Sequence, residues 1–220
     1  MAIFGYDAIG SGVANFGTTG AIYGTNFTTP ANCESADSMT VYFEMSGGRA
    51  STVWTAKLAI YRLSDGALIG ATEERFWDNV APDPDPNPNP PANGWYTFNF
   101  SPALTLVPST AYILVGWGQI TGSTLGSPVF KMKWTADASY DIYAQDIAYT
   151  GTFPDPHGLT DIADGKFAIY ATYTPTGINF QINIGDAWKA ISAMQINIGD
   201  VWKPVSSAKI NIGDAWKTIF

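Results

Sequence analysis

The chain has 220 residues, 46% of them hydrophobic and 14% aromatic, and its formal net charge is −8. This length and apolar content exclude an intrinsically disordered chain, and the acidic balance without a cluster of Lys and Arg argues against a nucleic-acid partner. No apolar run of about 18 residues predicts a membrane-spanning segment, so we expect no membrane insertion. The N-terminal residues show no secretory signal, which predicts a protein made in the cytoplasm or one whose signal has been removed.

Residues 1–175 alternate short β-rich runs with turn residues, which predicts an all-β fold with a β-sandwich or jelly roll. In the first clear run, Val41, Phe43 and Met45 share one side of the strand. In the fourth run two sets of side chains oppose one another, namely Tyr112, Leu114 and Gly116 against Ile113, Val115 and Trp117. The predicted strands are 40–45, 56–63, 95–100, 111–117, 129–134 and 166–173.

A proline-rich run separates the second and third of these strands. Its prolines alternate with Asp and Asn, which fixes φ and excludes a helix or a central strand, so we predict an extended surface loop at 81–93. Asp83 and Asp85 are candidate metal ligands at its tip. Alternate side chains of an extended chain point apart, whereas calcium needs converging oxygens, so we predict a spacer and no metal site.

Residues that could carry catalysis are few. Cys33 is the only cysteine and His157 the only histidine, which excludes an intramolecular disulfide and a Cys-based zinc site. His157 lies in a turn-rich loop with no nucleophile motif nearby, so we predict a solvated side chain. Glu73 and Glu74 could supply half of a glycosidase carboxylate pair, but adjacent residues of a strand face opposite sides. We therefore expect no enzyme, no catalytic residue and no cofactor.

Five tryptophans of residues 1–175 could include platforms for sugar stacking, because aromatic faces stack on pyranose rings. Most are predicted to lie in the core. Trp77 is the candidate for an exposed glycan contact, since it adjoins the proline-rich run. Trp95 begins a strand and is predicted to be buried.

The C-terminal part contains an internal repeat with a period of 14 residues. The three copies occupy 181–194, 195–208 and 209–220, and each begins with Gln or Lys followed by Ile-Asn-Ile-Gly-Asp-x-Trp-Lys. A unit of this length is typical of strand, turn and strand, so we predict three repeated β-hairpins.

The turn of each hairpin can have two lengths. A two-residue Gly-Asp turn pairs Ile184 with Ala187 and Asn183 with Trp188. A three-residue turn pairs Ile184 with Trp188, and we prefer this register because it hides the largest apolar group together with the isoleucines.

A single hairpin is marginally stable in water, so the three must bury their apolar faces. They can form a small triangular prism within one chain, or three chains can intertwine into a longer trimeric prism. The tryptophans could instead form a ladder of exposed sugar platforms, although core packing is the preferred interpretation. The predicted packing and oligomerisation residues are Ile182, Ile184, Trp188, Ile196, Ile198, Trp202, Ile210, Ile212 and Trp216.

The charge distribution divides the chain at the same place as the repeats. Residues 1–175 carry 7 basic and 16 acidic residues, whereas 176–220 carry 4 Lys and 3 Asp. We therefore predict two domains, a β-sandwich at 1–175 and the hairpin repeats at 176–220.

The repeats resemble the short Val/Ile-Asn-Val/Ile-Gly-x-x-Trp-Lys repeats near the C-termini of bacteriophage virion proteins, among them tail-associated, fibre and head-surface components. Segments such as 58–63 and 94–100 are similar to β-sandwich modules of extracellular and virion-surface proteins, a likeness that concerns architecture only. The resemblance implies a virion-surface protein that assembles inside the host.

The function expected from this resemblance is that of a non-enzymatic structural component of a virion, such as a head-decoration, fibre or tail-associated protein. The repeats would anchor the chain to other virion proteins, or assemble it as a homotrimer or higher symmetric oligomer, while the acidic domain faces solvent. The alternative is a carbohydrate-binding module or host-surface adhesin that contacts a glycan. A polysaccharide-degrading enzyme is the least favoured interpretation.

Overall fold

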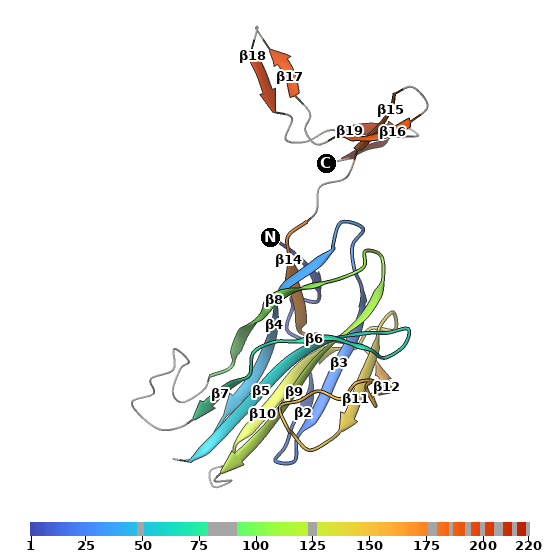
Figure 1. Cartoon of the computed structure of the whole chain (residues 1–220). Helices are drawn as coiled ribbons and strands as arrows, with labels where there is room; N and C mark the ends of the chain where they lie inside the picture. Colours follow the sequence, from blue (N-terminus) through green and yellow to red (C-terminus); the bar gives the residue numbers. More distant parts are fainter. Residues whose placement is uncertain are drawn as a thin grey trace. The chain divides into compact units, whose positions relative to one another are not determined.

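The computed structural model describes residues 1–47, 51–78, 92–122 and 127–175, together with the backbone of strands between Phe180 and Thr218. Every regular element in this part of the chain is a β-strand, so the prediction of an all-β protein is confirmed. The chain divides into two compact units, Met1–Pro175 and Thr176–Phe220 (Figure 1). We call them the N-terminal and the C-terminal unit.

Seven strands of the N-terminal unit form an antiparallel sheet that we call sheet 1. Its order is β1-β14-β4-β10-β13, with β2 also paired to β10 and β8 also paired to β4. Strand β4 has β8 on one edge and β14 on the other, because Ser38 pairs with both Asn99 and Thr172. The strands are β1 (Ala2–Gly5), β2 (Gly12–Asn15), β4 (Ser35–Ser46), β8 (Gly94–Thr105), β10 (Val129–Thr135), β13 (Lys166–Phe167) and β14 (Ile169–Tyr173).

Seven further strands form a second antiparallel sheet, sheet 2. Its order is β12-β11-β3-β9-β5-β6, with β7 also paired to β5. Strand β9 lies between β3 and β5 and pairs with both along most of its length (Figure 1). The strands are β3 (Ala21–Thr28), β5 (Thr52–Arg62), β6 (Leu68–Ala71), β7 (Arg75–Asp78), β9 (Ala111–Gly122), β11 (Asp141–Asp146) and β12 (Thr160–Asp164).

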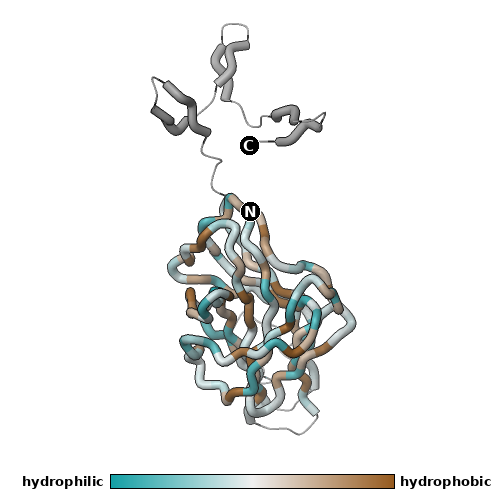
Figure 2. Tube along the Cα trace, turned by 90° about the vertical axis from the view of Figure 1, so that its right-hand side faces the viewer, coloured by the Kyte–Doolittle hydropathy of each residue, from teal (hydrophilic) through white to brown (hydrophobic). Residues whose placement is uncertain are grey.

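The two sheets share one large hydrophobic cluster. Val41, Phe43 and Met45 of β4 are at most 1% exposed, so the prediction that they share one side of the strand is confirmed, and that side is buried. Hydrophobic stretches, drawn in brown in Figure 2, are interspersed with hydrophilic ones along the trace of this unit. This pattern is expected of strands with one face in a core and one toward solvent.

Sheet 2 has a second hydrophobic cluster on its other face. A connection at 147–159, between β11 and β12, covers this face, and we call it the cover loop. Rings of the cover loop pack on strand residues, with Tyr149 4.8 Å and Phe153 5.1 Å from Trp117 between ring centroids. The buried members of the cluster are Ile22, Ala59, Tyr61, Ile113, Val115, Trp117 and Phe153.

The C-terminal unit contains three two-stranded antiparallel sheets, one in each repeat. Ile184 pairs with Ala187 and Asn183 with Trp188, and the other two repeats have the equivalent pairs. The predicted pairing of Ile184 with Trp188 is therefore wrong. The physical reason is local, because a Gly-Asp pair favours a two-residue connection, and this preference outweighs the argument from burial of the indole.

The strands of this unit are β15 (Phe180–Ile184), β16 (Ala187–Ile191), β17 (Gln195–Ile198), β18 (Val201–Pro204), β19 (Lys209–Ile212) and β20 (Ala215–Thr218). The side chains for which packing was predicted lie outside the described part of the structure, so the prism stays a prediction.

All six strands predicted for residues 1–175 exist, and the predicted strand at 166–173 is divided at Ala168 into β13 and β14. Seven strands were not predicted, namely β1, β2, β3, β6, β7, β11 and β12. Of the predicted loop at 81–93, only Ala92 and Asn93 belong to the described residues. The side chain of Asn93 accepts a hydrogen bond from the amide of Met45 at 2.9 Å.

Two glycines of β9 let the sheets approach each other closely. A Cβ atom at Gly116 would lie 2.9 Å from Sδ of Met132, and one at Gly118 would lie 2.7 Å from Cε1 of Phe130. Both neighbours belong to β10 of sheet 1. The bare backbone of β9 therefore provides the space that side chains of the opposite sheet occupy.

The replacement Gly118→Ala is expected to lower the free energy of unfolding by about 1–3 kcal/mol. The new methyl group meets Phe130 and Phe16, whose ring centroids are already only 4.8 Å apart, so neither ring has space to move away. Urea unfolding followed by circular dichroism measures the loss. Gly94→Ala is the matched control, since Cε2 of Tyr96 is 3.9 Å from its added Cβ. Equal losses in both variants would contradict this account.

Candidate functional site

Trp77, the predicted glycan contact, lies in the core and is 0% exposed. Its ring is 5.1 Å from Tyr96 and 6.2 Å from both Phe43 and Phe98 between centroids. A ring enclosed in this way cannot stack on a sugar, so the prediction that Trp77 is exposed is wrong. The reason is the alternation of β7, which turns Phe76 outward, 53% exposed, and Trp77 inward.

The side chains of Glu73 and Arg75 bind the backbone of β8. The Glu73 carboxylate accepts the amide N–H of Asn99 at 2.8 and 2.9 Å, and Nη1 of Arg75 donates to the carbonyl oxygen of Thr97 at 2.8 Å. These groups lie at the edge of β8 that faces away from β4. The carboxylate of Glu73 thus accepts a hydrogen bond from a backbone N–H group of β8, and the guanidinium of Arg75 donates one to a backbone carbonyl oxygen. A neighbouring strand would form the same two kinds of hydrogen bond.

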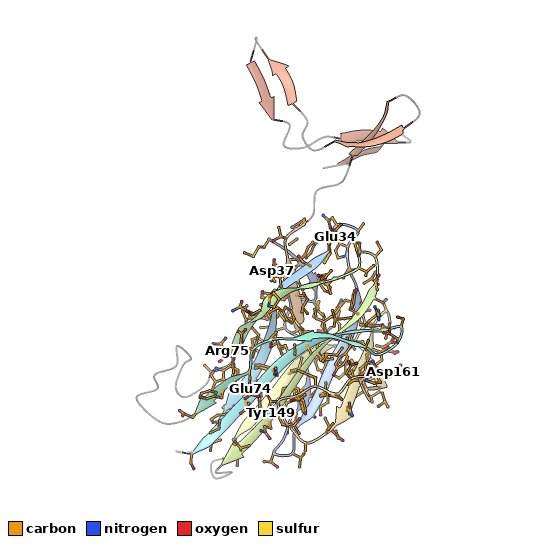
Figure 3. All side chains as sticks on the ribbon, viewed as in Figure 1. Glu34, Asp37, Glu74, Arg75, Tyr149 and Asp161 are labelled. Atoms are coloured by element: carbon orange, nitrogen blue, oxygen red, sulfur yellow. The ribbon has the colours of Figure 1, made fainter. Side chains whose placement is uncertain are left out.

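The carboxylate of Glu74 lies elsewhere. Its Oε2 accepts a hydrogen bond from the hydroxyl of Tyr149 at 2.7 Å, and Figure 3 shows the two side chains close together. Burial, followed by this hydrogen bond and the charge of Glu74, raises the pKa of Tyr149 well above its ordinary value. Both carboxylates considered for glycoside hydrolysis are therefore engaged in fastening segments of the N-terminal unit.

His157 is half-buried in the cover loop, so the prediction of a solvated side chain is wrong. Its ring packs edge-on against Tyr61 with centroids 5.1 Å apart, and its Nδ1 accepts the amide N–H of Leu159 at 3.2 Å. The hydroxyl of Tyr61 also donates to the carbonyl oxygen of Pro154 at 2.7 Å. Burial lowers the pKa of His157, so the ring is held in its neutral form. Its contacts fasten the cover loop.

The outward face of sheet 1 carries a row of aromatic side chains from three neighbouring strands. Tyr42 of β4 is the cross-strand partner of Trp95 of β8, and Tyr170 belongs to β14 on the other edge of β4. Trp95 is 36% exposed, so its predicted burial is wrong. We call Trp95, Tyr42 and Tyr170 the aromatic row.

The rings of the aromatic row lean together over β4. Trp95 and Tyr170 belong to strands two positions apart in the sheet, which are separated by about 10 Å. Their ring centroids are nevertheless 5.6 Å apart, and the ring of Tyr42 is also 5.6 Å from that of Trp95. Thr40, which lies between β8 and β14, is only 3% exposed although it belongs to the outward face. We attribute this burial to the rings above it.

The absence of a side chain at Gly5 leaves space for Tyr170. Gly5 of β1 is the cross-strand partner of Tyr170, and a Cβ there would lie 2.5 Å from Cα and 2.8 Å from Cβ of that residue. Gly5 also has a φ of +124°, which side-chain-bearing residues rarely adopt. The aromatic row therefore depends on a bare backbone beside it.

Polar side chains lie on both sides of the aromatic row along the strands. Beyond Tyr42, Glu44 forms ion pairs with Lys131, at 3.5 Å, and with Lys133. The hydrogen bond from Lys133 holds the pKa of Glu44 below its ordinary value. On the other side of the row lies the exposed Thr97, whose hydroxyl shares a hydrogen bond of 2.8 Å with that of Thr40 beneath the rings. An aromatic surface bordered by donors and acceptors can bind a ligand that is apolar on one face and polar at its rim.

Two hollows lie beside β11 and β12 and share Tyr23 and Ile162 in their linings. The first, of about 320 Å³, is mostly apolar and includes Trp134 and Phe167. The second, of about 390 Å³, includes Gln145 among its polar residues. Within the described ranges, no group of three or more His, Cys, Asp and Glu side chains could hold a metal ion.

The sequence contains the pattern that distinguishes the two tryptophans. In β8, Tyr96, Phe98 and Phe100 occupy alternate positions and are buried, whereas Trp95 and Thr97 occupy the intervening ones. A strand with three aromatic residues on one side directs that side to the core. Trp95 therefore belongs to the solvent face, a conclusion that the alternation alone supports.

No protein-family model, curated protein or solved structure matches the chain. Where the structure describes the chain, it contains no helix that is long and apolar enough to cross a membrane.

The replacement Glu73→Ala is expected to lower the free energy of unfolding by about 1 kcal/mol, because the amide of Asn99 loses its charged acceptor. Urea unfolding monitored by fluorescence measures the change. Glu34→Ala, which removes another exposed carboxylate of the N-terminal unit just before β4, is the control and should leave the midpoint unchanged (Figure 3). A Glu73→Ala protein as stable as the parent would show that the contact with β8 contributes nothing.

The folded-state pKa of His157 should lie below its ordinary value of about 6.5, because burial disfavours the charged ring. The unfolded chain then binds a proton more readily, so this contribution to stability is present above pH 6.5 and is lost as the pH falls below it. His157 is the only histidine, so a proton NMR titration of its Cε1–H resonance measures the pKa directly. A folded-state value at or above that in concentrated urea would contradict the prediction.

Proposed function

We propose that the chain is a non-enzymatic structural component of a bacteriophage virion, of the head-decoration, fibre or tail-associated kind. The observation that carries the proposal is the 14-residue repeat, with seven positions identical in all three copies and the same strand register in each. Such a repeat builds an assembly surface from copies of one small unit. Because the motif resembles repeats of bacteriophage virion proteins, we infer that this surface takes part in virion assembly.

The two units take different roles in this proposal. The repeats anchor the chain to other virion proteins, or join copies of it as a homotrimer, by packing their isoleucines and tryptophans into a prism. The N-terminal unit, as a β-sandwich or jelly roll, projects to solvent on the virion surface. Its 16 acidic residues against 7 basic ones support this placement, because a net negative charge limits nonspecific association.

The contacts of the carboxylates and of the histidine support a non-catalytic role. Glu73 and Glu74 are engaged by Asn99 and Tyr149, and His157 accepts the amide N–H of Leu159 while its ring packs on Tyr61. Groups held in this way stabilise the fold and are poorly placed to serve as a free acid or base.

Light scattering of the full chain and of a shortened chain ending at Pro175 tests the assembly role. We expect a mass of about three times 23.6 kDa for the full chain and of a single copy for the shortened one. The full chain with Ile182→Asp, Ile196→Asp and Ile210→Asp should also be monomeric, because a charge in an apolar packing surface opposes association.

Near-UV circular dichroism of the shortened chain is the control, since the N-terminal unit has its own core and should keep its aromatic signal. A full chain that is monomeric in solution and absent from purified particles would refute the proposal.

A further inference from the structure

We propose that the aromatic row on the outward face of sheet 1 binds a neutral polysaccharide, with a pyranose ring stacked on Trp95. This proposal goes beyond an assembly role and depends on the N-terminal unit alone. It therefore can fail or succeed independently of the repeats.

The ring of Trp95 offers a surface for stacking. It leans over β4 toward Tyr170, and Thr40 beneath the row is shielded from solvent. One side of the aromatic row thus rests on the sheet while 36% of the surface of Trp95 stays accessible. The negative π-face of an indole attracts the weakly positive C–H groups of a sugar ring, which are numerous on one face of a pyranose.

Polar groups lie along the strands on both sides of the aromatic row. A pyranose that stacks by its apolar face directs its hydroxyl groups outward at its rim. Thr97 offers a hydroxyl on one side of the row, and the Glu44–Lys133 pair offers a carboxylate and an ammonium on the other. A carboxylate has about four acceptor sites and an ammonium three donors, so both retain capacity for a ligand after they pair.

The charge of the N-terminal unit and the openness of the face select the ligand. The N-terminal unit carries more than twice as many acidic as basic residues, which repels anionic glycans and favours neutral ones. Neither of the two hollows described above includes a member of the aromatic row in its lining. A single sugar gains little on an open sheet face, whereas an extended chain contacts it over several residues. The geometry therefore points to a polysaccharide.

Affinity electrophoresis of the full chain tests the proposal in native gels containing hydroxyethylcellulose, glucomannan, dextran or mannan. Retardation in at least one of these gels is expected, and the apparent affinity should fall about tenfold or more in Trp95→Ala, because the largest stacking surface is removed. Tyr170→Ala should weaken binding in the same gel. Trp95→Phe keeps a ring and should retain part of the affinity.

Phe76→Ala is the matched control, since Phe76 is an exposed aromatic residue of sheet 2 outside the row. It should migrate as the parent chain does, and a gel containing dextran sulfate should not retard the parent. The absence of retardation in all four neutral gels would overturn the proposal, as would equal retardation of Trp95→Ala and the parent. A change of oligomeric state in Trp95→Ala without saccharide binding would assign the row to contacts between copies of this chain, and would also overturn it.

Discussion

Strand β9 is apolar on both sides, and residues 112–118 are buried without exception. One side, with Leu114, faces the core shared by the two sheets, and the other, with Val115 and Trp117, faces the cover loop. A strand of this kind is stable only where both of its faces are covered. The cover loop is therefore a required layer of the fold, and this requirement explains why its backbone is fastened at several points, among them Gly151 by Lys57.

A consequence is that the two sheets differ in what they offer to a ligand. The centre of sheet 2 is enclosed on both faces, whereas the outward face of sheet 1 carries exposed and half-buried side chains apart from the buried Thr40. The free edge of β8, which would otherwise invite pairing with another chain, is occupied by Glu73, from the connection between β6 and β7, and by Arg75 of β7. The aromatic row thus lies on the face of a sheet whose edge is closed nearby, and such a face favours ligand binding over strand exchange.

Alternation of apolar residues was enough to predict the all-β fold and the central strands, because those strands have long runs with one buried side. Short strands such as β2 and β12 were missed since four or five residues with few buried side chains carry no clear period. The site was predicted poorly for another reason. Trp77 was chosen for its place next to the proline-rich run, whereas the direction of a side chain depends on its position within the strand. The contacts of Glu73, Glu74 and His157 join segments far apart in the sequence, so no local pattern could predict them.

The proposed assembly would change the affinity of the proposed binding face for a polysaccharide. A sheet face with one large stacking residue provides little buried area, so a single copy binds weakly. When several copies are held together, the second contact becomes intramolecular and the overall affinity can rise by about 10²–10⁴ without any new contact. The gain requires copies whose binding faces reach the same polymer. An extended polysaccharide meets this requirement better than a single sugar does, because it presents the same ring repeatedly along its length.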